Sequence, residues 1–146
     1  MSQRLKLQAA ARLLLGLIFT VFGLNGFFHF IPQPPAPAAA MAFGGALAAT
    51  GYMFPLIKGT EVAVGVLLLA GRFVPLALTV LAPIVVNIVA FHLFLAPAGL
   101  ALPIVIVLLG VYLAWTERAA YAPLFHTRNE AAAASVRPGT PARVHG

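Results

Sequence analysis

Long apolar runs, separated by short breaks of proline, glycine and charged residues, make up most of the chain. The apolar runs cover residues 13–31, 52–70, 73–95 and 100–115. Each run is near the ~20 residues that a helix needs to cross a bilayer. The pattern predicts an all-α integral membrane protein whose transmembrane domain, residues 13–116, is a four-helix bundle.

The segment between the first two runs is different. Prolines at positions 32, 34, 35 and 37 end the first helix, because proline lacks the amide donor and clashes with the preceding turn. Residues 38–50 are uncharged and rich in alanine and glycine, and they are too short to span a bilayer. We therefore expect an interfacial or re-entrant segment here.

The composition supports a membrane location and excludes several chemistries. The chain is 62% hydrophobic and 8% charged, whereas a soluble domain has about 45 to 50% apolar and about 25% charged residues. It contains no cysteine, which excludes disulfide exchange, thiolate metal sites and iron–sulfur ligation. Any redox role therefore needs a bound cofactor or a partner.

Positive charge gathers outside the apolar runs. The formal net charge is +6, and basic residues occur before the first run, between the second and third, and after the fourth. No aromatic residues are interleaved with them, so we expect no nucleic-acid partner. The positive-inside rule places both termini, residues 1–12 and the basic tail 117–146, in the cytoplasm. We expect the tail to be largely disordered.

A signal peptide is the alternative interpretation of the first run. The basic residues before it and the small residues at 36–40 are typical of such a peptide. However, the run at 13–31 is longer than the ~7–15 apolar residues of a signal peptide, and it contains Asn25 and His29. We therefore interpret it as the first membrane span.

Lys58 and Glu61 lie inside the second apolar run. A charged side chain in the middle of a span costs about 3 kcal/mol on insertion scales, so it normally faces protein or water and has a partner. The two residues are three positions apart, which puts them on one face of a helix, within reach of each other. Either the ion pair only offsets the free-energy cost of placing the two charges in the membrane, or it is the centre of a functional site.

Further polar residues fall at a similar depth. At about 1.5 Å per residue, the same outer half of the membrane as Lys58 and Glu61 contains Asn25, His29, Asn87 and His92. One interpretation is that they hold helices together, at about 0.6 to 2 kcal/mol for each hydrogen bond. The other is that they line a pocket. Structural contacts alone would be expected in both leaflets, whereas these residues all fall in one.

Two chemistries fit such a pocket. A quinone headgroup needs hydrogen-bond donors and a group that exchanges protons. Glu61 would be the proton-exchanging group, and Lys58 would adjust its proton affinity. His92, Asn87, His29 and Asn25 are then the candidate contacts to the headgroup. Alternatively, Glu61 and the histidines form a proton or solute site in a small carrier without redox activity. We predict no metal site, because no His-x-x-His or Glu-x-x-His spacing occurs.

Small residues on the spans predict close contacts between helices. They are Gly16, Thr20, Gly23, Gly65, Gly110 and Ala114.

The chain resembles the DoxX family of small bacterial membrane proteins over about residues 10 to 125. The resemblance rests on RLLLG at 12–16 with Gly23, EVAVGVLLLAG at 61–71, and APIVVN at 82–87 followed by Phe91 and His92. It implies a four-helix bundle in the bacterial inner membrane, often a small subunit or accessory of a respiratory oxidoreductase. DoxD-like members are linked to thiosulfate oxidation with quinone as acceptor. The lack of cysteine departs from thiol-redox relatives similar to MauE.

The expected partners are membrane lipid, an oxidoreductase subunit, which the resemblance implies, and further copies of the chain. A carrier or a membrane chaperone without redox activity is the alternative function.

Overall fold

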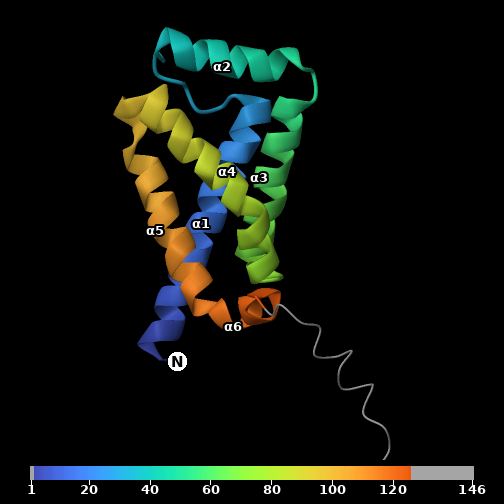
Figure 1. Cartoon of the computed structure of the whole chain (residues 1–146), viewed down its shortest axis with the longest axis vertical. Coiled ribbons are helices and arrows are strands. Elements are labelled where there is room, and N and C mark those ends of the chain that lie inside the picture. Colours follow the sequence, from blue (N-terminus) through green and yellow to red (C-terminus); the bar gives the residue numbers. More distant parts are fainter. Residues whose placement is uncertain (1, 126–146) are drawn as a thin grey trace, which may run out of the picture.

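The computed structural model describes residues 2–125, and all regular secondary structure in this range is helical. The long helices α1 (Gln3–Phe28), α3 (Met53–Ala70), α4 (Val74–Phe94) and α5 (Ala101–Thr116) form the bundle. α2 (Ala38–Ala49) lies across one end of it (Figure 1). The other elements are the short helices η1 (Pro97–Gly99), α6 (Arg118–Tyr121) and η2 (Ala122–Phe125). The predicted all-α class is confirmed for the described residues.

α1, α3 and α4 are each long and apolar enough to cross a membrane. α5 reaches that length only together with α6 and η2, which are bent away from it by 74°. The chain is therefore a multi-pass helical membrane protein with three candidate spans, or four if the bent pair counts as one.

The observed helices lie close to the predicted spans, except in α1. The runs predicted at 52–70, 73–95 and 100–115 correspond to α3, α4 and α5 within two residues at each end. α1, by contrast, begins at Gln3 rather than at residue 13, because the basic segment continues the helix and Ser2 caps it by accepting from the Leu5 amide. It ends at Phe28 rather than at residue 31, because His29 is left-handed with a φ of 53°.

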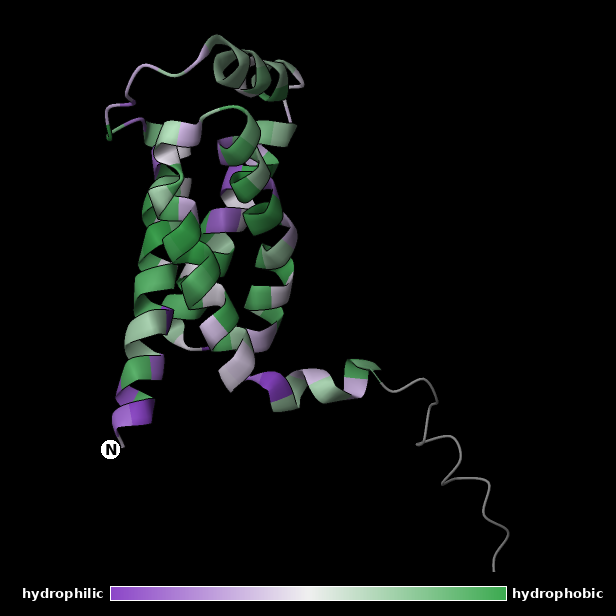
Figure 2. Cartoon of the chain, turned by 60° about the vertical axis from the view of Figure 1, so that its left-hand side comes forward, coloured by the Kyte–Doolittle hydropathy of each residue, from purple (hydrophilic) through white to green (hydrophobic). Residues whose placement is uncertain are grey.

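The two ends of the bundle differ in composition. The N-terminus, the turn between α3 and α4, and α6 lie at one end, which we call the basic end. We call the opposite end, covered by α2, the α2 end (Figure 1). Figure 2 shows apolar residues through the middle of the bundle, and polar residues at the basic end and on the helices just below α2. Residues 126–146 of the predicted tail lie outside the described residues.

Side chains at the basic end bond across helices. Arg12 Nη1 donates to the carbonyl oxygens of Leu68 and, at 3.0 Å, of Leu69 at the end of α3. Gln8 donates to Glu117 at 3.0 Å. At the same end, the Tyr121 hydroxyl donates to the Pro75 carbonyl oxygen at 2.9 Å. These bonds join α1 to α3 and to the end of α5, and α6 to α4.

α1 and α3 pack with their backbones close together. A methyl group on Gly65 would lie 2.6 Å from the Thr20 amide nitrogen, and one on Gly16 would lie 3.0 Å from the Gly65 oxygen. The small residues predicted here are therefore needed for the contact. The prediction for Gly110 is wrong, because a methyl group there meets nothing within 4 Å. The largest fully buried side chains are Phe19, Leu15, Leu68, Leu81, Leu113 and Pro103.

Candidate functional site

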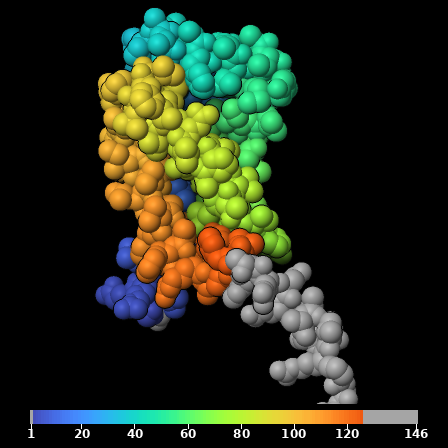
Figure 3. All heavy atoms as spheres, in the orientation of Figure 1, coloured from blue at the N-terminus to red at the C-terminus, as the bar shows by residue number. Residues whose placement is uncertain are grey.

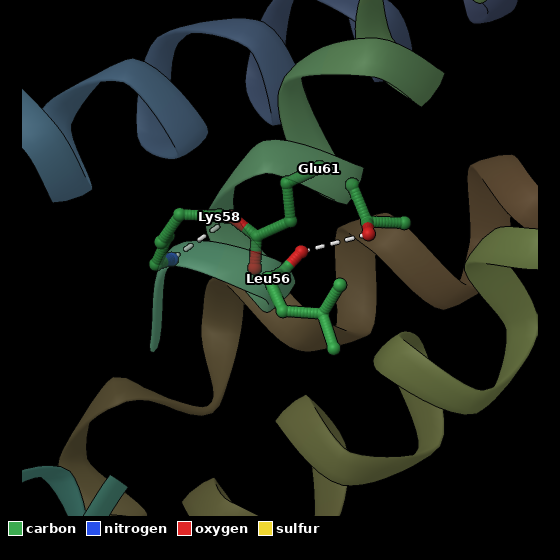
Figure 4. A network of polar contacts seen from close by, with 4 residues as sticks. Leu56, Lys58 and Glu61 are labelled. Carbon is green, nitrogen blue, oxygen red and sulfur yellow. Dashed lines mark hydrogen bonds and ion pairs between the residues drawn. The ribbon is translucent and has the colours of Figure 1, made fainter. Parts of the chain in front are cut away.

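The charged pair in α3 is the centre of the candidate site. Lys58 Nζ and Glu61 Oε2 are 2.9 Å apart, one helical turn from each other (Figure 4). Glu61 is only 3% exposed, whereas the Lys58 side chain is 23% exposed. The carboxylate is thus held inside the bundle, and its lysine partner is partly exposed. The pairing agrees with the three-residue spacing.

Glycines of α1 make room for this pair. A methyl group on Gly23 would lie 3.2 Å from the Glu61 Cβ, and one on Gly26 would lie 2.6 Å from the Lys58 Cγ and Cδ. The stem of Lys58 therefore lies across Gly26. The sequence prediction missed Gly26. The signal was its spacing of three from Gly23: glycine weakens a helix interior, so two glycines on one face indicate that another helix packs closely there.

The next face of α3 carries a separate, apolar groove. The Thr60 hydroxyl donates to the Leu56 oxygen of its own helix at 2.8 Å (Figure 4). A groove of about 400 Å³ lies between this face and α4. Its lining residues are Pro55, Leu56, Gly59, Thr60, Ala63, Val64 and Leu67 of α3, and Leu76, Ala77 and Val80 of α4. Glu61 and Lys58 do not line it, so the groove and the pair are distinct features.

Asn25 has a local role. It is 5% exposed, and its Oδ1 accepts a hydrogen bond of 2.6 Å from the Ile31 amide. The side chain thereby holds the chain as it leaves α1, and it makes no hydrogen bond to Lys58 or Glu61. His29, in the left-handed position after α1, is exposed.

His92 bonds within α4. Its Nδ1 lies 2.8 Å from the Ile88 carbonyl oxygen, and a methyl group on Gly99 would lie 3.0 Å from its Nε2. Because a carbonyl oxygen can only accept, Nδ1 carries the proton and Nε2 of the neutral ring is an acceptor. The ring also contacts Phe91 edge-on at 5.1 Å between centroids. In this tautomer the neutral ring of His92 can accept a hydrogen bond at Nε2.

Asn87 is exposed on the outer surface of α4. Of the predicted polar residues, the structure joins only Lys58 and Glu61, and within residues 2–125 each side chain is the other's sole hydrogen-bond partner. In the same part of the chain, no three His, Cys, Asp or Glu side chains come together as they would around a metal ion.

Comparisons with known proteins give no matching family model, no matching curated protein and no matching solved structure. The fold and the site therefore define the class by physical features alone. It is a multi-pass helical membrane protein with a partly buried ion pair within one of its spans.

Proposed function

We propose that this chain is a four-span protein of the bacterial inner membrane, with both termini in the cytoplasm and a DoxX-like role. Basic residues at one end of the bundle support this orientation, because basic loops remain on the cytoplasmic side. They include Arg4 and Lys6 at the N-terminus, Arg72 between α3 and α4, and Arg118 in α6. In this role the chain is a small subunit or accessory of a quinone-linked oxidoreductase.

The observation that carries the proposal is the burial of Glu61 beside Lys58 in the middle of α3. Ionisable residues inside a membrane bundle are rare and typically serve proton or ligand binding. A bound quinone would supply the redox chemistry, in which two electrons from the partner subunit and two protons give the quinol. Glu61 exchanges a proton with the ligand, and Lys58 stabilises the negative charge of its carboxylate.

The residues fit a quinone in part. The Lys58 ammonium has three donors and spends one on Glu61, so it can also donate to a carbonyl oxygen. Its partial exposure makes it reachable from outside the bundle. Asn25, His29, Asn87 and His92 have no hydrogen bond to the pair, so the proposal gives them no contact with the reacting oxygen.

A proton or solute carrier, or a chaperone-type bundle without redox activity, is the second candidate. The observation that favours it is that Lys58 and Glu61 bond only to each other among residues 2–125. A pair of this kind can hold and release a proton without a redox partner.

Binding of a short-chain benzoquinone to the purified protein in mild detergent tests the proposal. We expect saturable binding that weakens at least about tenfold, roughly 1.4 kcal/mol, in Glu61→Gln and in Lys58→Met. Glu117→Gln is the matched control, because Glu117 lies at the basic end and accepts from Gln8. Absence of saturable binding in the parent protein would contradict the proposal. Proton flux into liposomes that depends on Glu61 would then support the carrier.

A further inference from the structure

Asn87 presents an amide to the lipid-facing side of α4. It is exposed, and its side chain makes no hydrogen bond within residues 2–125. α4 ends at Phe94, seven residues further on, which places Asn87 roughly 10 Å inside that end of the span at 1.5 Å per residue. Hydrocarbon offers an amide no partner, and an unpaired polar group there is unfavourable.

The amide lies on an exposed stripe of α4. The stripe consists of Leu76, Val80, Pro83, Asn87 and Phe94, all of which are exposed. Spacings of three, four and seven put these residues on one face of the helix. The buried residues of α4 occupy a different face and belong to its first half: Val74, Ala77, Leu78 and Leu81. Figure 3 shows α4 in front of the bundle, with α2 above the end of it that follows Asn87.

The groove beside α4 continues this surface. Leu76 and Val80 belong both to the stripe and to the groove of about 400 Å³. On the α3 side the groove contains Gly59 and Ala63, and a methyl group on Gly59 would meet nothing within 4 Å. Small residues allow another helix to approach closely. The surface thus has an apolar recess next to a single polar group.

We propose that a second copy of this chain docks on this surface, with the two α4 stripes facing each other and the two Asn87 amides bonded reciprocally. An amide carries both donors and acceptors, so it is complementary to itself. In a two-fold interface, a residue on the axis meets its own equivalent. The stripe has no charge that would repel its copy. A lipid acyl chain would fill the recess but would leave the amide without a partner.

This inference does not depend on the proposed function. Lys58 and Glu61 face the glycines of α1, on a different side of α3 from the groove. A dimer through α4 would leave the pair and its approach from the edge of the bundle unchanged.

Disulfide cross-linking in membranes tests the dimer, and the chain suits it because it has no cysteine of its own. Val80→Cys places a thiol on the stripe, at a residue 41% exposed, and Val86→Cys is the control, because Val86 is 68% exposed but lies on another face of α4. Under mild oxidation we expect several-fold more disulfide-linked dimer from Val80→Cys than from Val86→Cys.

The amide is tested in the same background. Adding Asn87→Leu to Val80→Cys should reduce the dimer yield several-fold, whereas Asn87→Gln, which keeps the amide, should retain most of it. Unfolding temperatures of the variants should be alike in detergent, because Asn87 is exposed. Energy transfer between donor- and acceptor-labelled copies in liposomes should fall with Asn87→Leu as well. Equal yields at positions 80 and 86, no cross-link at either, or no effect of Asn87→Leu would each overturn the inference.

Discussion

The two ends of the bundle use their polar side chains in opposite ways. At the basic end, Arg12, Gln8 and Tyr121 each bond to a helix other than their own. At the α2 end, Asn25 bonds six residues ahead, Lys58 bonds three residues ahead and His92 bonds four residues back. Polar side chains therefore link different helices at the basic end, whereas at the α2 end they bond within their own stretch of chain.

This difference indicates where the helices can adjust. A ligand or a partner that separates α3 from α4 at the α2 end breaks apolar contacts but no cross-helix hydrogen bond from these side chains. At the basic end, moving α3 away from α1 would break the bond from Arg12, and moving α4 away from α6 would break the bond from Tyr121. We therefore expect substitutions at the basic end to change stability, and substitutions at the α2 end to change ligand binding.

Gly65→Ala should have the largest effect on stability. Gly65 lies on the basic side of Glu61, and the added methyl group would lie 2.6 Å from the Thr20 amide nitrogen and 2.9 Å from the Gly16 oxygen. Both are backbone atoms, which cannot rotate away, so α1 and α3 must separate. We expect a loss of about 2 to 3 kcal/mol in the free energy of unfolding, measured by denaturant titration in detergent micelles.

The control for this variant is Gly110→Ala on α5. A methyl group there meets nothing within 4 Å, so it should stabilise the helix by about 0.5 to 1 kcal/mol. If Gly65→Ala and Gly110→Ala unfold alike, backbone contact between α1 and α3 does not hold the bundle together.

Arg12→Met should have an intermediate effect. The guanidinium donates to two of the last carbonyl oxygens of α3, those of Leu68 and Leu69. The Leu68 oxygen also accepts from the Gly71 amide, and carbonyl groups in the last turn of a helix otherwise lack partners. Hydrogen bonds from charged donors contribute about 1.5 to 3 kcal/mol, so we expect a loss of about 2 kcal/mol in the same titration. Arg72→Met, which removes an exposed arginine at the same end, should change stability by less than about 0.5 kcal/mol. Equal losses in the two variants would mean that positive charge at this end, and not the hydrogen bond between α1 and α3, contributes the stability.

Gly26→Ala should have the smallest effect on stability. Its methyl group would meet only the Lys58 side chain, at 2.6 Å from Cγ and Cδ, and that side chain can rotate. We expect a change of less than about 1 kcal/mol, with a clear loss of quinone binding because Lys58 moves away from Glu61. Gly59→Ala, where a methyl group meets open space, should leave quinone binding unchanged and, like Gly110→Ala, stabilise the helix by about 0.5 to 1 kcal/mol. A stability loss as large as that of Gly65→Ala would show that the two ends are fastened equally.

The spans were predictable because length and proline decide them. An apolar run near 20 residues, bounded by proline, glycine or arginine, has few alternatives in a bilayer. α3 and α4 accordingly begin and end within one residue of the predicted runs. The start of α1 was not predictable from hydropathy, because residues 3–12 are polar and yet helical.

The site was predictable in depth but not in direction. Counting residues along a span gives the level of a side chain, whereas the pairing of Lys58 with Glu61 followed from their three-residue spacing within one helix. The direction around the helix needs a polar stripe to mark one face, and spans that are apolar on all sides have none. For this reason the sequence could not distinguish Asn87, which faces outward, from Glu61, which faces inward. Likewise, the bond from Arg12 depends on the register between α1 and α3, which no local pattern encodes.

The close fit between α1 and α3 has a consequence for biogenesis. The two helices run in opposite directions with only α2 and its flanking loops between them, so they form a helical hairpin (Figure 1). Every residue of their seam, from Arg12 to Gly71, has been synthesised before α4 begins at Val74. Because chains assemble from the N-terminus as they emerge from the ribosome, this hairpin can enter the membrane and close first. α4 and α5 then add to a template that already holds the charged pair between its helices.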